Sequence, residues 1–356
     1  MVNLSIKALL KSVVAYKASD LHLVSRSEPQ MRIDGKLIPL DMQKLDGTTI
    51  QEICYTLIND KQKRKLEEEK ELDFAIMLPE IGRFRANYYH TINSELAAAF
   101  RIIPTTIPSL DELKAPPVFK EIVQREKGLI LVTGPTGSGK STTLAAILNE
   151  INLFEHRHVI TVEDPVEFVH TNKKALFSHR NVGEDTRSFA TALKFSLRED
   201  PDVILVGEMR DQETISTAIT AAETGHLVMG TLHTNSAVQT INRVVDSFEG
   251  SEQVQVRNML ASSLYAVISQ SLLPRVGGGR VAIHEIMINN SAISNLIREN
   301  KLHQIYSQMQ LNQQKTGMIT QTQSMLQMLK ANLITKDDAL RFSTQPQELM
   351  NNLGIG

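Results

Sequence analysis

Short apolar runs alternate with helical patterns from about residue 118 onward. Four of these runs have the length and composition of buried strands, and a helical spacing of apolar residues follows the first of them. The order of strand, turn and helix then repeats, which is typical of a parallel sheet with crossover helices. The pattern therefore predicts an α/β core whose strands include 129–132, 159–162, 202–206 and 227–232.

The first hundred residues carry a different pattern, in which strand-like runs and amphipathic helices are mixed. A charge-dense stretch at 61–71, KQKRKLEEEKE, predicts a solvent-exposed helix rather than a docking patch. Arg83, Arg85 and Arg101 stand near the end of this region on alternating strand positions. A small α/β domain on an antiparallel sheet fits this pattern, with a further helix at 49–58 and strands at 21–24, 31–33, 81–88 and 96–103.

Prolines mark the boundary between these two regions. Four of them stiffen the chain there, at positions 104, 108, 116 and 117. Beyond the core strands, 235–275 has a largely helical pattern, 281–288 reads as one last strand, and the remainder has helical spacing. The expected organisation is an N-terminal domain at 1–103, a linker at 104–117, a core at 118–290 and a helical segment at 291–356.

The most informative motif follows the first core strand. Residues 134–142 read GPTGSGKST and match the phosphate-loop pattern G-x-x-x-x-G-K-[ST] between a strand and a helix. Glycines let successive N–H groups face one anion, and the following helix adds free N–H groups and its dipole. Lys140 can reach the β- and γ-phosphates, and the Ser141 hydroxyl can ligate Mg²⁺. The predicted nucleotide-binding residues are Gly134, Pro135, Thr136, Gly137, Ser138, Gly139, Lys140, Ser141 and Thr142.

Ionisable residues stand where the other core strands end. In an open α/β sheet, ligands bind at this carboxyl edge. Glu208 is the acid expected beside a phosphate loop, where it can hold Mg²⁺ through water or activate the attacking water. Glu163 is less specific, because an acid before Pro165 can also cap a helix. His226 and His233 bracket one strand and are candidate phosphate sensors, with a satisfied core histidine as the alternative.

Composition narrows the functional classes. Across 356 residues, 38 Lys and Arg against 40 Asp and Glu give a net charge of −2, so no basic surplus favours nucleic acid as a partner. The single cysteine, Cys54, excludes an intrachain disulfide and a cysteine-based zinc site. The longest apolar run, 96–100, is far shorter than a membrane span, and the start lacks a signal-peptide core. We therefore expect a cytoplasmic protein without direct membrane insertion.

Taken together, four motifs resemble the secretion ATPase superfamily, which powers type II secretion, type IV pili and related machines. GPTGSGKSTT, TVEDPVEF, REDPDVILVGEMRD and TGHLVMGTLHT look like its Walker A loop, acidic box, Walker B segment and histidine box. The stretches ASDLHL at 18–23 and GGGRVAIHEIMINN at 277–290 are similar to its pilus retraction branch, and the likeness covers about residues 5–345. The assembly branch usually adds a larger N-terminal domain and a four-cysteine zinc element, which one cysteine cannot supply.

The resemblance implies a hexameric ring with a PAS-like N-terminal domain, a RecA-like P-loop core and C-terminal helices, using ATP and Mg²⁺. The implied function couples ATP hydrolysis to type IV pilus retraction, by pilin depolymerisation, and to twitching motility. The implied partners are the other subunits of a homohexamer and the platform protein at the inner-membrane base of the pilus. An accessory retraction ATPase and an assembly or type II secretion ATPase are alternatives, and a nucleic-acid translocase with a similar core is a more distant one.

The same resemblance assigns roles to residues. Glu208 would orient the attacking water, and His226 and His233 would sense the γ-phosphate. An arginine finger is expected in the last strands of the first domain, which should face the nucleotide. Its candidates are Arg83, Arg85 and Arg101, and the metal ligands, some through water, are Ser141, Glu163 and Glu208.

One departure from the family pattern lies in residues 292–300, AISNLIREN, where the family carries arginine and this chain has Ser294. The apolar residues in this stretch have the i, i+3, i+4 spacing of a packed helix face. That spacing predicts that Ser294, Asn295 and Arg298 point outward. We expect the segment to transmit motion or to dock the pilus base.

Overall fold

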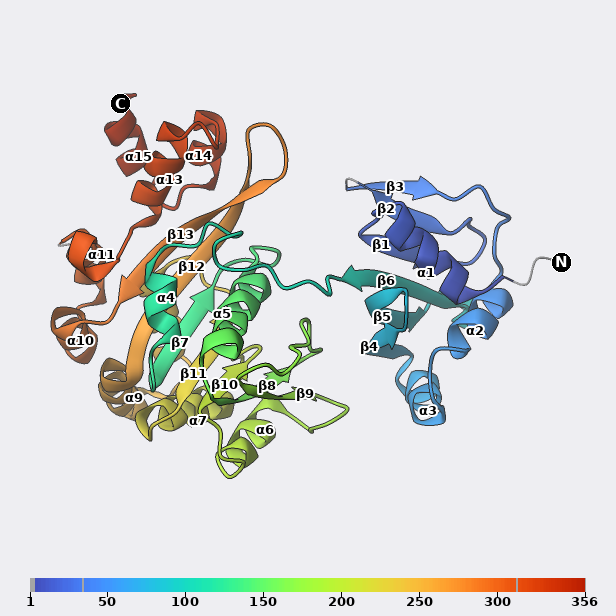
Figure 1. The fold of residues 1–356 in the computed structure, drawn as a ribbon, viewed down its shortest axis with the longest axis horizontal. Coiled ribbons are helices and arrows are strands. Elements are labelled where there is room, and N and C mark those ends of the chain that lie inside the picture. The colour runs from blue at the N-terminus through green and yellow to red at the C-terminus, as the bar shows by residue number, and fades with distance from the viewer. Residues whose placement is uncertain (1–3, 34, 312, 356) are drawn as a thin grey trace. The chain divides into compact units, whose positions relative to one another are not determined.

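The computed structural model describes residues 4–33, 35–311 and 313–355. The chain divides into two compact units, one ending at Thr106 and the other beginning at Ile107 (Figure 1). Each unit has its own sheet and its own buried core. The two units are described separately below.

The N-terminal unit is built on a six-stranded antiparallel sheet with the strand order β3-β2-β1-β6-β5-β4. Its strands are β1 (Asp20–Leu23), β2 (Gln30–Ile33), β3 (Lys36–Pro39), β4 (Glu71–Leu78), β5 (Gly82–His90) and β6 (Leu96–Ile103). Its helices are α1 (Ile6–Ala15), α2 (Gly47–Tyr55), α3 (Asp60–Glu69) and the short 3-10 turn η1 (Ile92–Ser94).

Alternation along β5 explains how this sheet packs. Phe84, Ala86 and Tyr88 are fully buried in the core that the helices complete, while Arg85 between them is exposed. The expected helix at 61–71 is α3, but it ends two residues earlier than predicted. Lys70 has a left-handed φ of 66°, which stops the helix, and the next residue already begins β4.

The C-terminal unit is built on a seven-stranded sheet with the order β13-β12-β7-β11-β10-β8-β9. All neighbours pair in parallel except β12 and β13, which form an antiparallel pair. The predicted parallel α/β core is therefore present. Its strands are β7 (Gly128–Thr133), β8 (His158–Glu163), β9 (Leu176–Asn181), β10 (Val203–Val206), β11 (Leu227–Leu232), β12 (Leu264–Pro274) and β13 (Arg280–Ile288).

Helices cover both faces of this sheet, so that its central strands are buried on both sides (Figure 1). One face packs against α4 (Val118–Val123) and α5 (Lys140–Phe154). The other face packs against α6 (Phe189–Ser196), α7 (Gln212–Glu223), α8 (Ala237–Val245), α9 (Gly250–Ser263), α10 (Ser291–Arg298), η2 (Leu302–Gln304) and α11 (Ile305–Met309).

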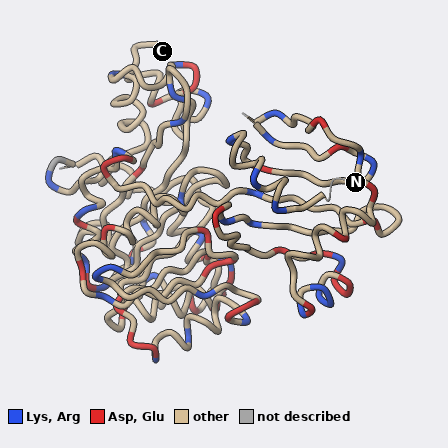
Figure 2. The backbone as a smooth tube through the Cα atoms, turned by 45° about the vertical axis from the view of Figure 1, so that its right-hand side comes forward, with Lys and Arg blue, Asp and Glu red and all other residues tan. Residues whose placement is uncertain are grey.

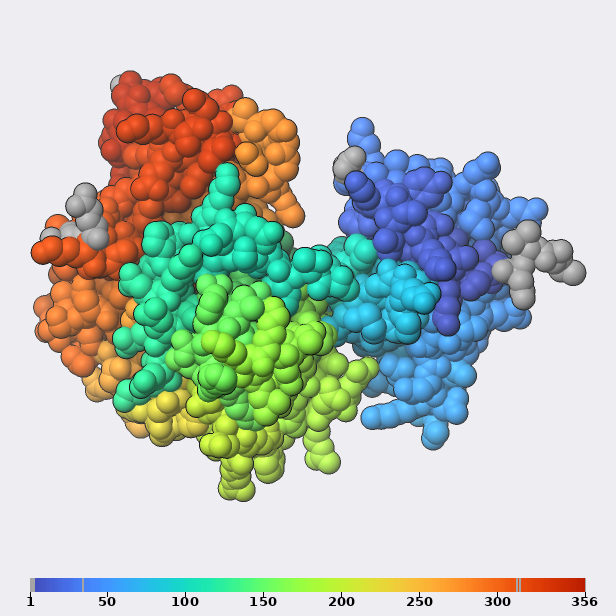
Figure 3. All heavy atoms as spheres, viewed as in Figure 1, coloured from blue at the N-terminus to red at the C-terminus, as the bar shows by residue number. Residues whose placement is uncertain are grey.

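The last helices pack on the far end of the β12–β13 hairpin (Figure 3). They are α13 (Gln321–Lys330), α14 (Lys336–Phe342) and α15 (Pro346–Leu353), and the short helix α12 (Gln313–Thr316) precedes them. Leu273 and Ile283 of the hairpin form a small core with Met325, Ala339 and Leu349 of these helices. The hairpin therefore belongs at once to the central sheet and to the C-terminal helices.

Two sequence-based expectations for this unit are wrong. The stretch 235–275 is not helical to its end, because β12 begins at Leu264 and runs for 11 residues beside β7. Ser294 does not point outward, since it is 8% exposed and its hydroxyl donates to the Ala261 carbonyl at 2.7 Å. Helix α10 thus packs on α9 with a wider face than the apolar spacing indicates, and of the three residues expected to point outward only Asn295 and Arg298 are exposed.

Ser294 provides a test of this packing. We expect Ser294→Ala to lower the free energy of unfolding by about 1 kcal/mol, because the buried Ala261 carbonyl loses its side-chain donor. Ser291→Ala, on the exposed start of the same helix, is the matched control and should change stability by less than about 0.5 kcal/mol. Chemical denaturation of both variants measures the difference, and equal values would contradict the packing described.

Candidate active site

The phosphate loop occupies the turn between β7 and α5. Residues 134–139 form the loop, and Lys140 is the first residue of the helix. Gly134 and Gly139 have φ values of 142° and 88°, a conformation that favours glycine at both positions. The loop therefore leads directly into a helix N-terminus, which presents free N–H groups and a positive dipole end to an anion.

The Lys140 side chain lies over its own loop. Its Nζ donates to the Gly134 carbonyl at 2.7 Å and to the Pro135 carbonyl at 3.1 Å. Burial lowers the Lys140 pKa, and the nearby carboxylates of Glu208 and Glu167 oppose that effect. A partly desolvated ammonium group of this kind interacts strongly with a phosphate that enters the loop.

Glu208 lies one residue past Gly207, just after β10, and contacts two basic side chains. Arg210 donates from Nε to Glu208 Oε1 at 2.6 Å, and His233 Nε2 lies 3.0 Å from the same oxygen. The hydrogen bond from Arg210 is the main reason that the Glu208 pKa lies below its usual range, although burial acts in the opposite direction. The carboxylate is thus ionised and 20% exposed at the edge of the sheet.

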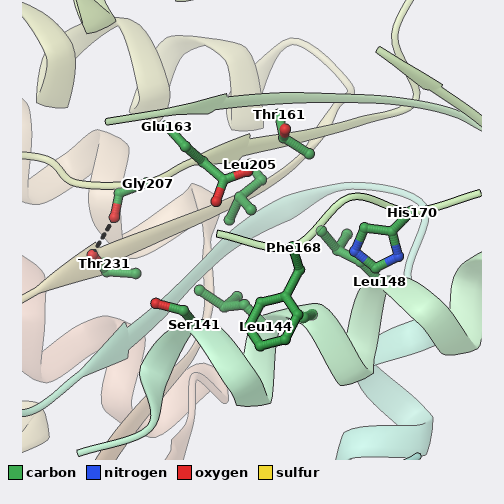
Figure 4. Close-up of a pocket in the computed structure, with 11 residues that line it drawn as sticks. Ser141, Leu144, Leu148, Thr161, Glu163, Phe168, His170, Leu205, Gly207 and Thr231 are labelled. Carbon is green, nitrogen blue, oxygen red and sulfur yellow. Dashed lines mark hydrogen bonds between the residues drawn. The ribbon is translucent and has the colours of Figure 1, made fainter. Parts of the chain in front are cut away.

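A small cavity separates the start of α5 from the end of β8. It has a volume of about 30 Å³, and Ser141, Thr161 and Glu163 line it together with Phe168 and Leu144 (Figure 4). That volume suits one or two waters or a small hydrated ion. Within the described residues, no group of three or more His, Cys, Asp or Glu could hold a metal alone. Hydroxyl and carboxylate oxygens that leave most positions to phosphate and water fit Mg²⁺.

The two candidate histidines lie at opposite ends of β11, so they cannot share one role at this site. His233 follows the strand and reaches Glu208. His226 precedes it, six strand residues away, which corresponds to about 20 Å. Its Nδ1 lies 3.0 Å from the Ala221 carbonyl near the end of α7, where it caps the helix. His226 therefore lies far from the phosphate loop of its own chain, and its role as a sensor of the γ-phosphate stays a prediction.

The three candidate arginines lie on one side of the N-terminal sheet. Arg85 and Arg101 are direct cross-strand neighbours on β5 and β6. Arg85 is paired with Asp73, and the Arg101 Nε donates to Asp20 at 2.7 Å. Arg83 is 7% exposed, whereas the Arg101 side chain is 71% exposed. Of the three, Arg101 is the most accessible to a ligand, and each ion pair holds its arginine in a defined place.

Two residues at the site have no counterpart in the sequence-based assignment. Arg210 is within the motif GEMRD. Its position two residues after Glu208 was the sequence feature that could have indicated the ion pair between them. Gln270 comes from β12 and contacts the phosphate loop from behind. No motif marks it, because its position depends on the pairing of two strands that are far apart in the sequence.

Comparisons with known proteins agree with this geometry. The family model described as Type II/IV secretion system protein matches residues 1–278. The chain belongs to this family. Membership confirms the resemblance that the four motifs indicated, and the family's phosphate loop, acidic box, Walker B segment and His233 meet at one edge of the sheet.

Relatives within the family match over nearly the whole chain. A Pseudomonas aeruginosa protein named type IV pilus retractation ATPase PilT is 47% identical over 97% of this chain and 99% of its own. A Neisseria gonorrhoeae protein named twitching motility protein is 48% identical over 95% of this chain and 90% of its own. A crystal structure of the pilus retraction motor PilT with bound ADP has a TM-score of 0.92 at 48% identity, covering 98% of this chain and all of that chain.

The ion pair between Arg210 and Glu208 generates a pH prediction for this family member. A depressed pKa keeps Glu208 ionised until the pH falls below the ordinary glutamate range. In Arg210→Gln the burial of Glu208 acts with less opposition, so its pKa rises and the acid limb of kcat/KM moves to higher pH. Arg243→Gln, an exposed arginine of α8, is the control and should leave the profile unchanged. An unchanged acid limb in both variants would show that Glu208 ionisation does not limit turnover.

Proposed function

We propose that this chain is the ATPase motor that retracts type IV pili. The observation that carries the proposal is the near full-length match to proteins named for pilus retraction and twitching motility, at 47–48% identity, together with an assembled phosphate-loop site. ATP hydrolysis supplies the free energy, and depolymerisation of the pilus is the work performed. The chain's relatives in retraction machines are named as ATPases, which supports the hydrolytic reaction.

The site supports a positioning mechanism. Phosphoryl transfer to water needs little covalent help, so catalysis rests on alignment and on stabilising the developing charge. The loop N–H groups and Lys140 hold the β- and γ-phosphates, and Glu208 orients the attacking water, with His233 placed to report on the γ-phosphate. Ser141 would hold Mg²⁺, with Glu163 supporting its waters, and the bound ion would supply charge neutralisation at the phosphates.

The proposed working form is a homohexamer in which a neighbour completes each site. Arg101 and Arg85 are the candidates for a finger that reaches a nucleotide in trans, because both side chains are exposed at a sheet surface. ATP hydrolysis then removes the γ-phosphate, which links the arginine of one subunit to the phosphate loop of its neighbour. Loss of such a contact is a common way to convert chemistry into rigid-body motion. The charge-paired arginines supply the switchable contact in this scheme.

The proposed place of action is the cytoplasmic face of the inner membrane, on the platform protein at the pilus base. Among the described residues, no helix is both long enough and apolar enough to cross a membrane. Attachment to the pilus base then comes from the protein partner. The Arg298 side chain, exposed at the end of α10, is the best-placed residue of segment 292–300 to contribute to that contact.

Three other functions are separated from this one by simple experiments. An assembly ATPase predicts that cells lacking the chain have no pili, whereas a retraction motor predicts hyperpiliated cells that do not twitch. An accessory retraction ATPase predicts that cells lacking the chain lose only part of their twitching motility.

The charge distribution argues against a nucleic-acid translocase. Basic and acidic positions are interspersed along the described chain (Figure 2), and the net charge is −2. Stimulation of ATP hydrolysis by DNA would instead support a nucleic-acid translocase.

Glu208 and Lys140 make the central prediction. Glu208→Gln keeps the shape of the side chain and removes its charge, so ATP still binds while kcat falls by at least about 100-fold. Lys140→Ala removes the phosphate-binding ammonium, so ATP binding and turnover are both lost. Fluorescent nucleotide titration and phosphate release separate the two effects. Turnover at the wild-type rate in Glu208→Gln would contradict the assigned role.

The arginines generate a complementation prediction. Arg101→Ala alone should lower kcat by about 10³-fold if Arg101 acts as an arginine finger, while nucleotide affinity stays nearly constant. Mixed with Lys140→Ala subunits, which retain Arg101, the variant should regain part of its turnover, because a Lys140→Ala neighbour supplies the missing arginine to an intact phosphate loop. Arg32→Ala, a further charged residue of the same sheet near Asp20, is the control. Absence of rescue would leave Arg101 as a structural partner of Asp20.

A further inference from the structure

Gln270 occupies a distinctive place in the central sheet. The last residue pair between β12 and β7 is Ser269 with Thr133, so Gln270 is the first residue of β12 beyond the end of β7. At this level β7 turns into the phosphate loop. The Gln270 side chain is 5% exposed and is enclosed between the loop and α5. None of the roles assigned above uses it.

Both ends of the Gln270 amide make short hydrogen bonds. Its Nε2 donates to the Ser138 carbonyl at 2.7 Å, and its Oε1 accepts from the Thr143 hydroxyl at 2.7 Å. The Ser138 carbonyl can only accept, which fixes the orientation of the amide. One buried side chain therefore ties the loop to the first turn of the helix that follows it.

Gln270 also lies against the glycines at both ends of the loop, through its backbone at Gly134 and through its side chain at Gly139. A Cβ on Gly134 would lie 2.1 Å from the Gln270 carbonyl oxygen, and a Cβ on Gly139 would lie 2.8 Å from Gln270 Nε2. Real side chains do not tolerate either contact. The backbone of the loop thus lies close against Gln270 at two points, and the bond to the Ser138 carbonyl opposes movement of the loop away from β12.

The bond to Ser138 also sets the direction of an N–H group. In a trans peptide the carbonyl of one residue and the N–H of the next point in opposite directions. Because Gln270 holds the Ser138 carbonyl behind the loop, the Gly139 N–H points away from Gln270, toward the side where the loop receives phosphate. We propose that Gln270 is a positioning residue that pre-orients the Gly139 N–H for nucleotide phosphates.

This inference rests on the proposed function, because it presumes that the loop binds a nucleotide. Its energetic basis is preorganisation: a peptide unit already facing the anion does not have to be turned and ordered when the ligand arrives. Gln270 acts through the loop backbone and has no contact with reacting atoms. Its removal should therefore weaken phosphate binding in general, with little dependence on the base of the nucleotide.

The test compares Gln270→Met with wild type in the full chain. Methionine has a similar length but no amide donor. We expect the dissociation constants of Mg–ADP and of Mg–tripolyphosphate both to rise by about tenfold, the equivalent of losing one well-placed hydrogen bond. Thr143→Val is the matched control, since it removes the other bond of the amide and leaves the Ser138 bond in place. It should leave both constants within about twofold of the wild-type values, because the Ser138 bond remains.

Each outcome decides the matter. Equal affinities of wild type and a folded Gln270→Met would overturn the inference, and so would a loss for ADP without a loss for tripolyphosphate, because the effect would then involve the nucleoside part. If Gln270→Met does not fold, Gln270→Glu replaces it, since an ionised carboxylate keeps the shape of the side chain but cannot donate to the Ser138 carbonyl, and unchanged affinities for both ligands then overturn the inference. Failure of the wild type to bind either ligand, with Lys140→Ala identical to it, would refute the proposed function instead.

Discussion

The register of the parallel strands is the constraint on which the candidate site depends. Thr133 at the end of β7 is level with Leu232 of β11 and with Ser269 of β12. The next residues along these three strands are Gly134, His233 and Gln270, so the loop and two of its neighbours emerge side by side. The same reasoning applies to β8 and β10, where Val162 pairs with Val206 just before Glu163 and Gly207. A shift of one pair would separate these groups, and buried strands resist such shifts.

The strand register also brings acidic and basic side chains together at the carboxyl edge of the sheet. Lys140 and Arg210 bring two cations to a region that contains Glu208 and Glu163, so opposite charges face each other in a partly desolvated place. Interactions of this kind are stronger than at an open surface, because the local dielectric constant is lower. The result is a site in which the Glu208 carboxylate is ionised and a phosphate meets an ammonium group that is already near its position.

The sequence allowed much of this to be predicted, for identifiable reasons. The buried runs in the core and the loop motif are local signals, and both the parallel sheet and the family are confirmed. β12 was missed because it follows helix α9 without a turn, and a polar segment, Ser269 to Ser271, interrupts its apolar run. The separation of His226 from the phosphate loop follows from strand direction, because the two ends of one strand lie at opposite edges of the sheet. The Gln270 contact could not be predicted, since it joins residues 132 positions apart.

The β12–β13 hairpin links the site to the C-terminal helices by direct contact. Gln270 holds the phosphate loop, and three residues further along the same strand Leu273 is buried among α13, α14 and α15. On β13, the buried Glu285 accepts the Ala237 N–H at 2.8 Å, at the start of α8, which follows the His233 loop. Burial raises the Glu285 pKa, so its hydrogen bonds are needed to keep it in place. A displacement of the phosphate loop or of the His233 loop can therefore reach the last helices through direct contacts of β12 and of β13.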